Sequence, residues 1–279
     1  MKLESAFKID KIIDAALEED IENGDITTAA IIDMSTKGQA TLVAKEEILL
    51  AGMEIFTRVF TRLDPEISVK WVYHDGDIIP SGYDIGTIHG PLQGILTGER
   101  TALNFLQHLS GIATLTKKYV DKTNPLKVKV IDTRKTTPGL RILEKYAVRV
   151  GGGFNHRHGL FDGILVKDNH IAAAGSITKA LKKIMVNVPH TLKIEIEVED
   201  IEGLEEAIAA GADAILLDNM SVEDMKKAVV LAKGKVLLEA SGGVTLETIG
   251  EIAKTGVNLV SVGALTHSAR SVDISLKMV

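Results

Sequence analysis

The chain has 279 residues, which is enough for one large domain or two small ones with a substantial buried core. Its net charge of -6 argues against nucleic acid as a partner, and the lack of cysteine excludes disulfides, a thiolate nucleophile and cysteine-bound metal. No apolar run approaches the roughly 20 residues that cross a bilayer. The first ten residues carry charges where a signal peptide would have its apolar segment. We therefore expect a cytoplasmic globular protein with no membrane partner.

The first third of the chain predicts a small α+β domain. Apolar residues recur at helical spacing over residues 9–21, and this helix should end near Asn23 and Gly24. A β-rich region follows, in which apolar and polar residues alternate between turn signals, and this pattern predicts an antiparallel sheet. A long helical pattern covers residues 97–119. The expected strands are 41–43, 48–50, 67–73 and 83–89.

The rest of the chain alternates short apolar strands with helical segments. Such alternation predicts a parallel sheet with right-handed crossovers that closes, or nearly closes, into a barrel. Six strands are fewer than the eight of a complete TIM barrel, so we expect a smaller or partly open relative. The expected strands are 128–131, 164–166, 194–198, 214–217, 236–239 and 259–262. The expected helices are 140–150, 177–186, 201–210, 222–232 and 246–255.

The charge pattern indicates a small anionic ligand. Residues 127–170 contain nine Lys/Arg against four Asp/Glu, although the whole chain is acidic. Barrels of this type carry their chemistry at the carboxyl ends of the strands, and nearly every expected strand here ends in a polar or ionisable residue. Arg134, Arg157 and Lys167 at these ends could clamp substrate carboxylates.

Carboxylates and glycines at other strand ends complete the pattern. Lys193, Glu195 and Glu197 share one strand face, so they should point into the barrel; an internal Lys-Glu ion pair with a purely structural role is the alternative. Glu197 and Asp218 follow on consecutive strands and suit Mg2+ together with substrate oxygens. Glycine-containing segments after the last two strands, 241–243 and 263–265, are where barrels often bind phosphate.

Six ordered segments of the chain resemble the quinolinate phosphoribosyltransferase family, also called carboxylating nicotinate-nucleotide pyrophosphorylases. The likeness runs along essentially the whole chain and includes EDIENGDITT near the N-terminus and GERTALN at 98–104. The six segments are DTRKTTPGLR (132–141), GGGFNHRHGLFDGILVKDNH (151–170), KIEIEVE (193–199), LLDN (216–219), EASGG (239–243) and VGALTHS (262–268).

The resemblance implies an α/β fold with two domains. The first, residues 1–112, would be a small N-terminal α+β sandwich with an antiparallel sheet. The second, residues 113–279, would be an incomplete α/β barrel of six or seven strands, whose last residues could pack back on the first domain.

The resemblance also implies an activity. The chain would be a pentosyl transferase, a nicotinate-nucleotide diphosphorylase (carboxylating), which moves 5-phosphoribosyl from phosphoribosyl pyrophosphate to the ring nitrogen of quinolinate. Pyrophosphate and CO2 would leave, and nicotinate mononucleotide would form in de novo NAD biosynthesis. The substrates would be its small-molecule partners and Mg2+ its cofactor. It would act as a homodimer, or as a higher oligomer of dimers with shared active sites.

Site residues carry over position by position from the resemblance. Catalysis would fall to Lys135, Glu197 and Asp218, and the last two would also bind the metal. The quinolinate site would be Arg134, His156, Arg157 and Lys167, together with Arg100 from the neighbouring subunit. The phosphoribosyl pyrophosphate site would comprise Thr133, Lys135, Ser241, Gly242, Gly243, Gly263, Ala264 and Leu265.

Three alternatives remain open on the sequence. A molybdenum-operon relative of the same fold carries similar motifs. A Schiff-base aldolase could use Lys167 or Lys193 at a strand end. A non-catalytic sensor of an anionic metabolite would explain the cations but not the inward carboxylates.

Overall fold

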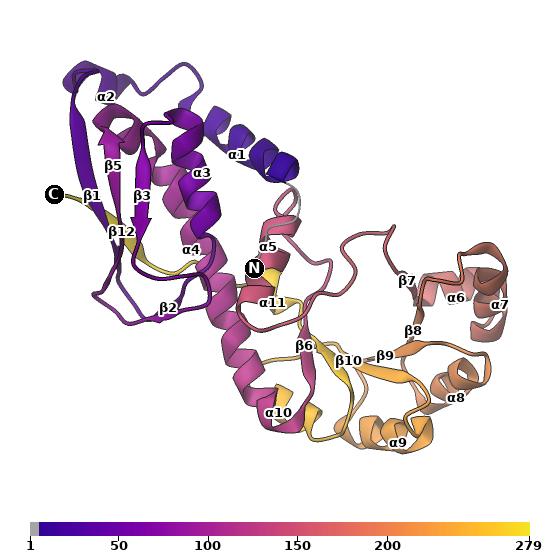
Figure 1. Ribbon diagram of the computed structural model, residues 1–279. Coiled ribbons are helices and arrows are strands. Elements are labelled where there is room, and N and C mark those ends of the chain that lie inside the picture. Colours follow the sequence, from indigo (N-terminus) through magenta and orange to yellow (C-terminus); the bar gives the residue numbers. More distant parts are fainter. Residues whose placement is uncertain (1–5) are drawn as a thin grey trace. The chain divides into compact units, whose positions relative to one another are not determined.

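A computed structural model describes residues 6–279 of the chain (Figure 1). Residues 1–5, half of the segment compared above with a signal peptide, lie outside the described residues. The chain forms two compact units, and the boundary expected after residue 112 stays a prediction, because the units exchange segments. The first unit comprises the described part of Met1–Lys117 with Thr136–Gly152 and Leu265–Val279, and the second comprises Lys118–Lys135 and Gly153–Ala264.

The first unit contains the antiparallel sheet that the sequence predicts. Its four strands lie in the order β12-β1-β5-β3, and all neighbouring pairs are antiparallel. Strand β12 comes from the end of the chain and pairs with β1, so the last residues complete the sheet that the early residues begin. Two short strands, β2 and β4, pair separately. The bounds are β1 Lys37–Ala44, β2 Ile48–Leu49, β3 Ser68–Trp71, β4 Ile78–Ile79, β5 Asp84–Pro91 and β12 Ile274–Met278.

Helices α1, α2, α3 and α5 belong to the first unit, and two of them, α2 and α3, are absent from the sequence prediction. Residues 53–63 form α3, although the alternating pattern of this region predicts strands and no helix. The helix buries Phe56 and Phe60 on one face, and Phe56 also packs edge-on against Trp71. The bounds are α1 Ala6–Ile21, α2 Ile26–Ile31, α3 Met53–Leu63 and α5 Arg141–Val150.

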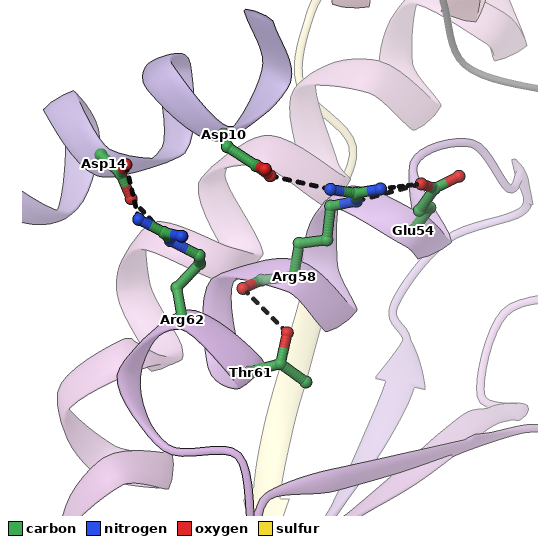
Figure 2. Close-up of polar contacts among 6 residues, drawn as sticks. All are labelled: Asp10, Asp14, Glu54, Arg58, Thr61 and Arg62. Atoms are coloured by element: carbon green, nitrogen blue, oxygen red, sulfur yellow. Dashed lines mark hydrogen bonds and ion pairs between the residues drawn. The ribbon is translucent and has the colours of Figure 1, made fainter. Parts of the chain in front are cut away.

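Two arginines of α3 form ion pairs with α1 (Figure 2). The Arg58 guanidinium bridges Asp10 of α1, at 2.8 Å, and Glu54 of its own helix. One turn further on, Arg62 pairs with Asp14 at 2.7 Å. Both pairs therefore link α1 to α3.

Helix α4 (Leu92–Thr123) is longer than the predicted 97–119, and its sequence runs from the first unit into the second. It is followed by a short 3-10 turn, η1 (Asn124–Leu126). Helix α11 (Ala264–His267) also crosses the boundary between the units. Among the helices of residues 6–279, none combines the length and the apolar content that a bilayer crossing requires.

The second unit is built on the predicted six-stranded parallel sheet. Its strand order is β6-β11-β10-β9-β8-β7, so β6 and β7 form the two edges. Phe154 makes an isolated parallel bridge with Ile131 at the β6 edge. The sheet is therefore an incomplete barrel, as expected. The strands are β6 Lys129–Ile131, β7 Ile164–Val166, β8 Ile194–Val198, β9 Ala214–Asp218, β10 Leu237–Ser241 and β11 Leu259–Ser261.

Helices connect consecutive strands of this sheet (Figure 1). Helices α7, α8 and α9 agree with the predicted positions, but α10 is five residues long where the sequence predicts a helix over residues 246–255. Helix α6 has no counterpart in the prediction, because its first residues read as the polar end of β7. The bounds are α6 Asp168–Ala174, α7 Ile177–Asn187, α8 Ile201–Ala209, α9 Val222–Ala232 and α10 Ile249–Ala253.

Side-chain alternation along the strands gives the sheet an apolar and a polar face. In β8 the residues Ile194, Ile196 and Val198 are buried, whereas Glu195 and Glu197 between them are half-buried. The cross-strand register continues the polar face, because Glu197 lies opposite Leu216, which in turn lies opposite Glu239. The carboxylates of β8 and β10 therefore share one face of the sheet.

Candidate active site

A cavity of about 560 Å³ lies at the carboxyl ends of the parallel strands. Its lining belongs entirely to the second unit, and its volume is in the range of small-molecule sites. Eleven residues that the sequence singled out meet here: Thr133, Arg134, Lys135, His156, Arg157, Lys167, Glu197, Asp218, Ser241, Gly242 and Gly243.

Four predicted site residues are not part of this lining in the described chain. Arg100 is exposed on α4 in the first unit. Gly263 follows β11, and Ala264 begins the four-residue helix α11. The side chain of Leu265 is fully buried, so only its backbone could serve a ligand. The predicted roles of these four residues stay predictions.

Arg157 presents an unused donor on the cationic side of the cavity. One of its terminal nitrogens, Nη1, donates to the carbonyl of Gly163 at 3.0 Å. Its Nε is buried without a hydrogen-bond partner, and buried donors in folded proteins are normally satisfied. Burial and the nearby Arg134 lower the pKa of Arg157, although a guanidinium stays charged in proteins. The site thus offers a desolvated cation to an anionic ligand.

Lys193 and Lys167 differ from each other in their surroundings. Lys193 is exposed before β8 and does not line the main cavity. Lys167 instead lies with its Nζ 2.8 Å from Oε2 of Glu197. Lys167 therefore links the cationic side of the cavity to the carboxylate side.

Two carboxylates on neighbouring strands form the acidic side of the cavity. Glu197 comes from β8 and Asp218 is the last residue of β9. The side-chain amide of Asn219 donates to Asp218 at 3.0 Å, and Asn219 also lines the cavity. Carboxylate oxygens with room for water and ligand oxygens are the donor set that Mg2+ prefers, so these residues fit the expected metal.

A glycine turn follows β10 at the edge of the cavity. Gly242 and Gly243 both have left-handed backbones, with φ of +94° and +56°. A Cβ on Gly242 would collide with the side-chain oxygen of Asn219, so only glycine fits there. The turn leaves the peptide backbone accessible to a ligand, as a phosphate site requires.

Glu239 is a cavity residue to which the sequence assigns no role. Its side chain is 1% exposed, and Oε1 has no hydrogen-bond partner. Burial, together with the nearby Glu195 carboxylate, raises the pKa of Glu239 well above its usual range. The signal that could have found it is the period of two along β10, which places Glu239 on the same face as Ser241. Leu165, Leu216, Asn219 and Ser261 also line the cavity without a role predicted from the sequence.

Comparison with known proteins identifies the family. The model of the quinolinate phosphoribosyl transferase C-terminal domain matches residues 112–277, and that of the N-terminal domain matches residues 25–110. The chain belongs to the quinolinate phosphoribosyltransferase family. The resemblance seen in the six sequence segments is therefore confirmed along nearly the whole chain.

Relatives of this phosphoribosyltransferase share both sequence and fold. A probable nicotinate-nucleotide pyrophosphorylase [carboxylating] from Bacillus subtilis is 46% identical over 269 residues, which cover 96% of this chain and 93% of the relative. A crystal structure of NadC from Streptococcus pyogenes has a TM-score of 0.96 and 46% identity, covering 100% and 99% of the two chains. The structure of a nicotinate-nucleotide pyrophosphorylase from Francisella tularensis has a TM-score of 0.93 and 44% identity, covering 98% of this chain and 96% of that one. The predicted α/β architecture is confirmed by these likenesses.

Proposed function

We propose that this chain transfers the 5-phosphoribosyl group from phosphoribosyl pyrophosphate to the ring nitrogen of quinolinate. Pyrophosphate and CO2 leave, and nicotinate mononucleotide forms for NAD biosynthesis. One observation carries the proposal: a family member gathers lysine and arginine cations, two carboxylates from neighbouring strands and a glycine turn in a single cavity of about 560 Å³. The relative from Bacillus subtilis carries the name of a probable carboxylating nicotinate-nucleotide pyrophosphorylase, which agrees with this reaction.

The cationic side would bind quinolinate. Arg157 has a buried Nε without a partner, and Arg134 and Lys167 line the same cavity. Arginine binds carboxylates through two parallel hydrogen bonds, which also fix the orientation of the ring. With both substrate carboxylates held, the ring nitrogen can point at the anomeric carbon. Such positioning can lower the reaction barrier by as much as roughly 7–11 kcal/mol.

The acidic side and the glycine turn would bind the donor. The backbone at Gly242 and Gly243 suits the 5-phosphate, and Thr133 and Lys135 lie in the same lining. Glu197 and Asp218 would hold Mg2+, which when bound neutralises charge on the pyrophosphate. Lys135 would stabilise the negative charge that develops on the departing oxygen as the bond to the anomeric carbon lengthens.

The position of Arg100 is compatible with an active site shared between subunits. Its side chain is exposed on α4, so a neighbouring subunit could receive it in a homodimer with shared sites, or in a higher oligomer of such dimers. The backbone of residues 263–265 would complete the phosphate site. The cytoplasm is the proposed compartment, which rests on the cysteine-free composition.

Lys167 disfavours the aldolase alternative. A Schiff-base lysine needs desolvated or cation-flanked surroundings, whereas Lys167 is half-exposed and bonded to Glu197 at 2.8 Å. The phosphoribosyl transfer hypothesis uses this ion pair as the link between two substrates.

A direct assay tests the function. The purified chain is incubated with phosphoribosyl pyrophosphate, Mg2+ and quinolinate, and CO2 and nicotinate mononucleotide are measured together. We expect both products in a 1:1 ratio, and none from nicotinate, which lacks the second carboxylate. The absence of product from quinolinate with every divalent cation tried would refute the proposal and favour the molybdenum-operon relative or the sensor.

A further inference from the structure

His156 is held at both ring nitrogens by the protein itself. Its Nδ1 accepts the peptide N-H of Arg157 at 2.7 Å, which places the ring proton on Nε2. Its Nε2 lies 3.0 Å from Oε2 of Glu195, a distance at which an N-H donates to a carboxylate. The two contacts together select one tautomer and one ring orientation.

The backbone on the same loop is also fixed. The fully buried Asp132 accepts the peptide N-H of His156 at 2.9 Å and the side-chain amide of Asn155 at 2.6 Å. Ring and backbone of His156 are therefore anchored by two carboxylates, Asp132 directly after β6 and Glu195 within β8. Because the ring in turn holds the N-H of Arg157, these anchors determine where the Arg157 side chain leaves the loop.

We propose that Glu195 is a positioning residue: acting through the ring of His156, it holds Arg157 where its guanidinium can bind a substrate carboxylate. Glu195 comes from β8, two residues before Glu197, and its side chain is 13% exposed. It contacts His156 rather than the proposed substrate. His156 accordingly orients Arg157. Its ring nitrogens contact Glu195 and the peptide N-H of Arg157 rather than quinolinate.

Glu239 supports Glu195 from β10. Its carboxyl group lies within 4.8 Å of both Glu195 and His156 and is buried. Burial raises the pKa of Glu239, and its protonated carboxyl group can donate a hydrogen bond to Glu195. Glu195 would then accept hydrogen bonds from both Glu239 and His156.

The first test is spectroscopic and independent of catalysis. Long-range 1H-15N spectra report the tautomer of each histidine, and the amide resonance of Arg157 reports its hydrogen bond. We expect a single Nε2-H form of His156 in the wild type and in Glu195→Gln, whose amide oxygen still accepts. Glu195→Ala should give a mixture of tautomers and a shifted Arg157 amide. An unchanged His156 spectrum in Glu195→Ala would overturn the assignment.

The second test is kinetic and uses the proposed quinolinate reaction. Glu195→Ala should raise KM for quinolinate by roughly tenfold or more, because small misplacements of a binding group are costly, and leave KM for phosphoribosyl pyrophosphate within twofold. Glu195→Gln should have a KM for quinolinate much closer to that of the wild type than to that of Glu195→Ala. Glu205→Gln, at an exposed position of α8, is the matched control and should behave like the wild type.

A double-mutant cycle separates action through His156 from an independent effect. If Glu195 works through His156, the variant with both His156→Ala and Glu195→Ala should have a KM for quinolinate no higher than the worse single variant. An increase in KM for quinolinate equal to the product of the two single increases would overturn the proposal. An equal increase in Glu195→Gln and in Glu195→Ala would also overturn it.

Two further outcomes have distinct meanings. Because the bound carboxylate comes from the proposed function, wild-type protein without turnover would refute that function, while the tautomer spectra would still decide the role of Glu195. A divalent ion that copurifies at one per chain and is lost from Glu195→Gln would overturn the positioning role, since Nε2 of His156 would then be a metal ligand.

Discussion

Arg157 and Asp218 represent the two chemical halves of the cavity. Arg157 brings a half-buried guanidinium whose buried Nε has no partner, and Asp218 brings a carboxylate at the end of β9. The proposed division gives the acceptor to the first and the Mg2+-bound donor to the second. Substitutions at these residues should therefore change different kinetic constants.

Arg157→Ala should raise KM for quinolinate by roughly 10- to 100-fold, because a charge-assisted hydrogen bond is worth about 1.5–3 kcal/mol. Asp218→Asn should instead raise KM for phosphoribosyl pyrophosphate and the Mg2+ concentration needed for half-maximal rate. Initial rates with each substrate varied in turn measure both effects. The reverse assignment of the two constants would contradict the division of the site.

Gly242 is a single position where backbone conformation and crowding coincide. Gly242→Ala should destabilise the fold by about 1–3 kcal/mol, because alanine resists a φ of +94° and its Cβ would meet Asn219. Thermal melting of the purified variant measures this loss. Gly234→Ala, with φ of +72° but open space around the position, is the control and should lose only the conformational part, about 1 kcal/mol.

At the scale of elements, ion pairs hold α1 along α3, and the two arginines differ in burial. The Arg58 side chain is 28% exposed and has two acidic partners, whereas that of Arg62 is 46% exposed and has one. Arg58→Ala should lower the free energy of unfolding by up to about 1 kcal/mol, and Arg62→Ala by less. Urea denaturation measures the free energy of unfolding of both variants. A loss of stability that is as large in 1 M NaCl as at low salt would show that packing of the arginine stems contributes more than the ion pairs.

The parallel sheet is predictable because each of its strands is a short apolar run between helical segments. The apolar runs at β7 and β8 give those strand bounds directly. Helix α3 escapes prediction although Ile55, Phe56, Val59 and Phe60 have helical spacing, since the alternating segments around it favour strands. Strand β12 is not predicted as a strand, because its partner β1 lies more than 200 residues away and leaves no local signal.

The candidate site is predictable at strand ends but not between them. Period-two alternation and the motif resemblance are enough to select Arg157, Glu197 and Asp218 from the sequence. The contact between Lys167 and Glu197, and the burial of Glu239, depend on how neighbouring strands pack their side chains. Spacing along one strand carries no information about such contacts.

At the scale of the whole molecule, Glu239 couples stability to pH. Its pKa in the folded protein is raised above the usual 4.5, chiefly by burial, so the folded state binds more protons than the unfolded state between these two values. Stability should therefore fall as pH rises from 4.5 through the folded pKa, and stay level above it.

Glu239→Gln should remove this dependence, because glutamine mimics the protonated carboxyl group and carries no charge. We expect the melting temperature of the variant minus that of the wild type to increase as pH rises from 5 upward. Melting curves at several pH values measure the difference, and a constant difference would contradict a proton held at Glu239.

The pairing of β12 with β1 separates the order of synthesis from the order of assembly. All six strands of the parallel sheet are translated before β12. Until β12 has been made, one edge of β1 has no partner strand. A nascent chain whose first 270 residues have left the ribosome can therefore form the later sheet but cannot complete the earlier one. Protease protection of stalled chains should consequently appear in the second unit before the first, against the usual N-terminal-first sequence.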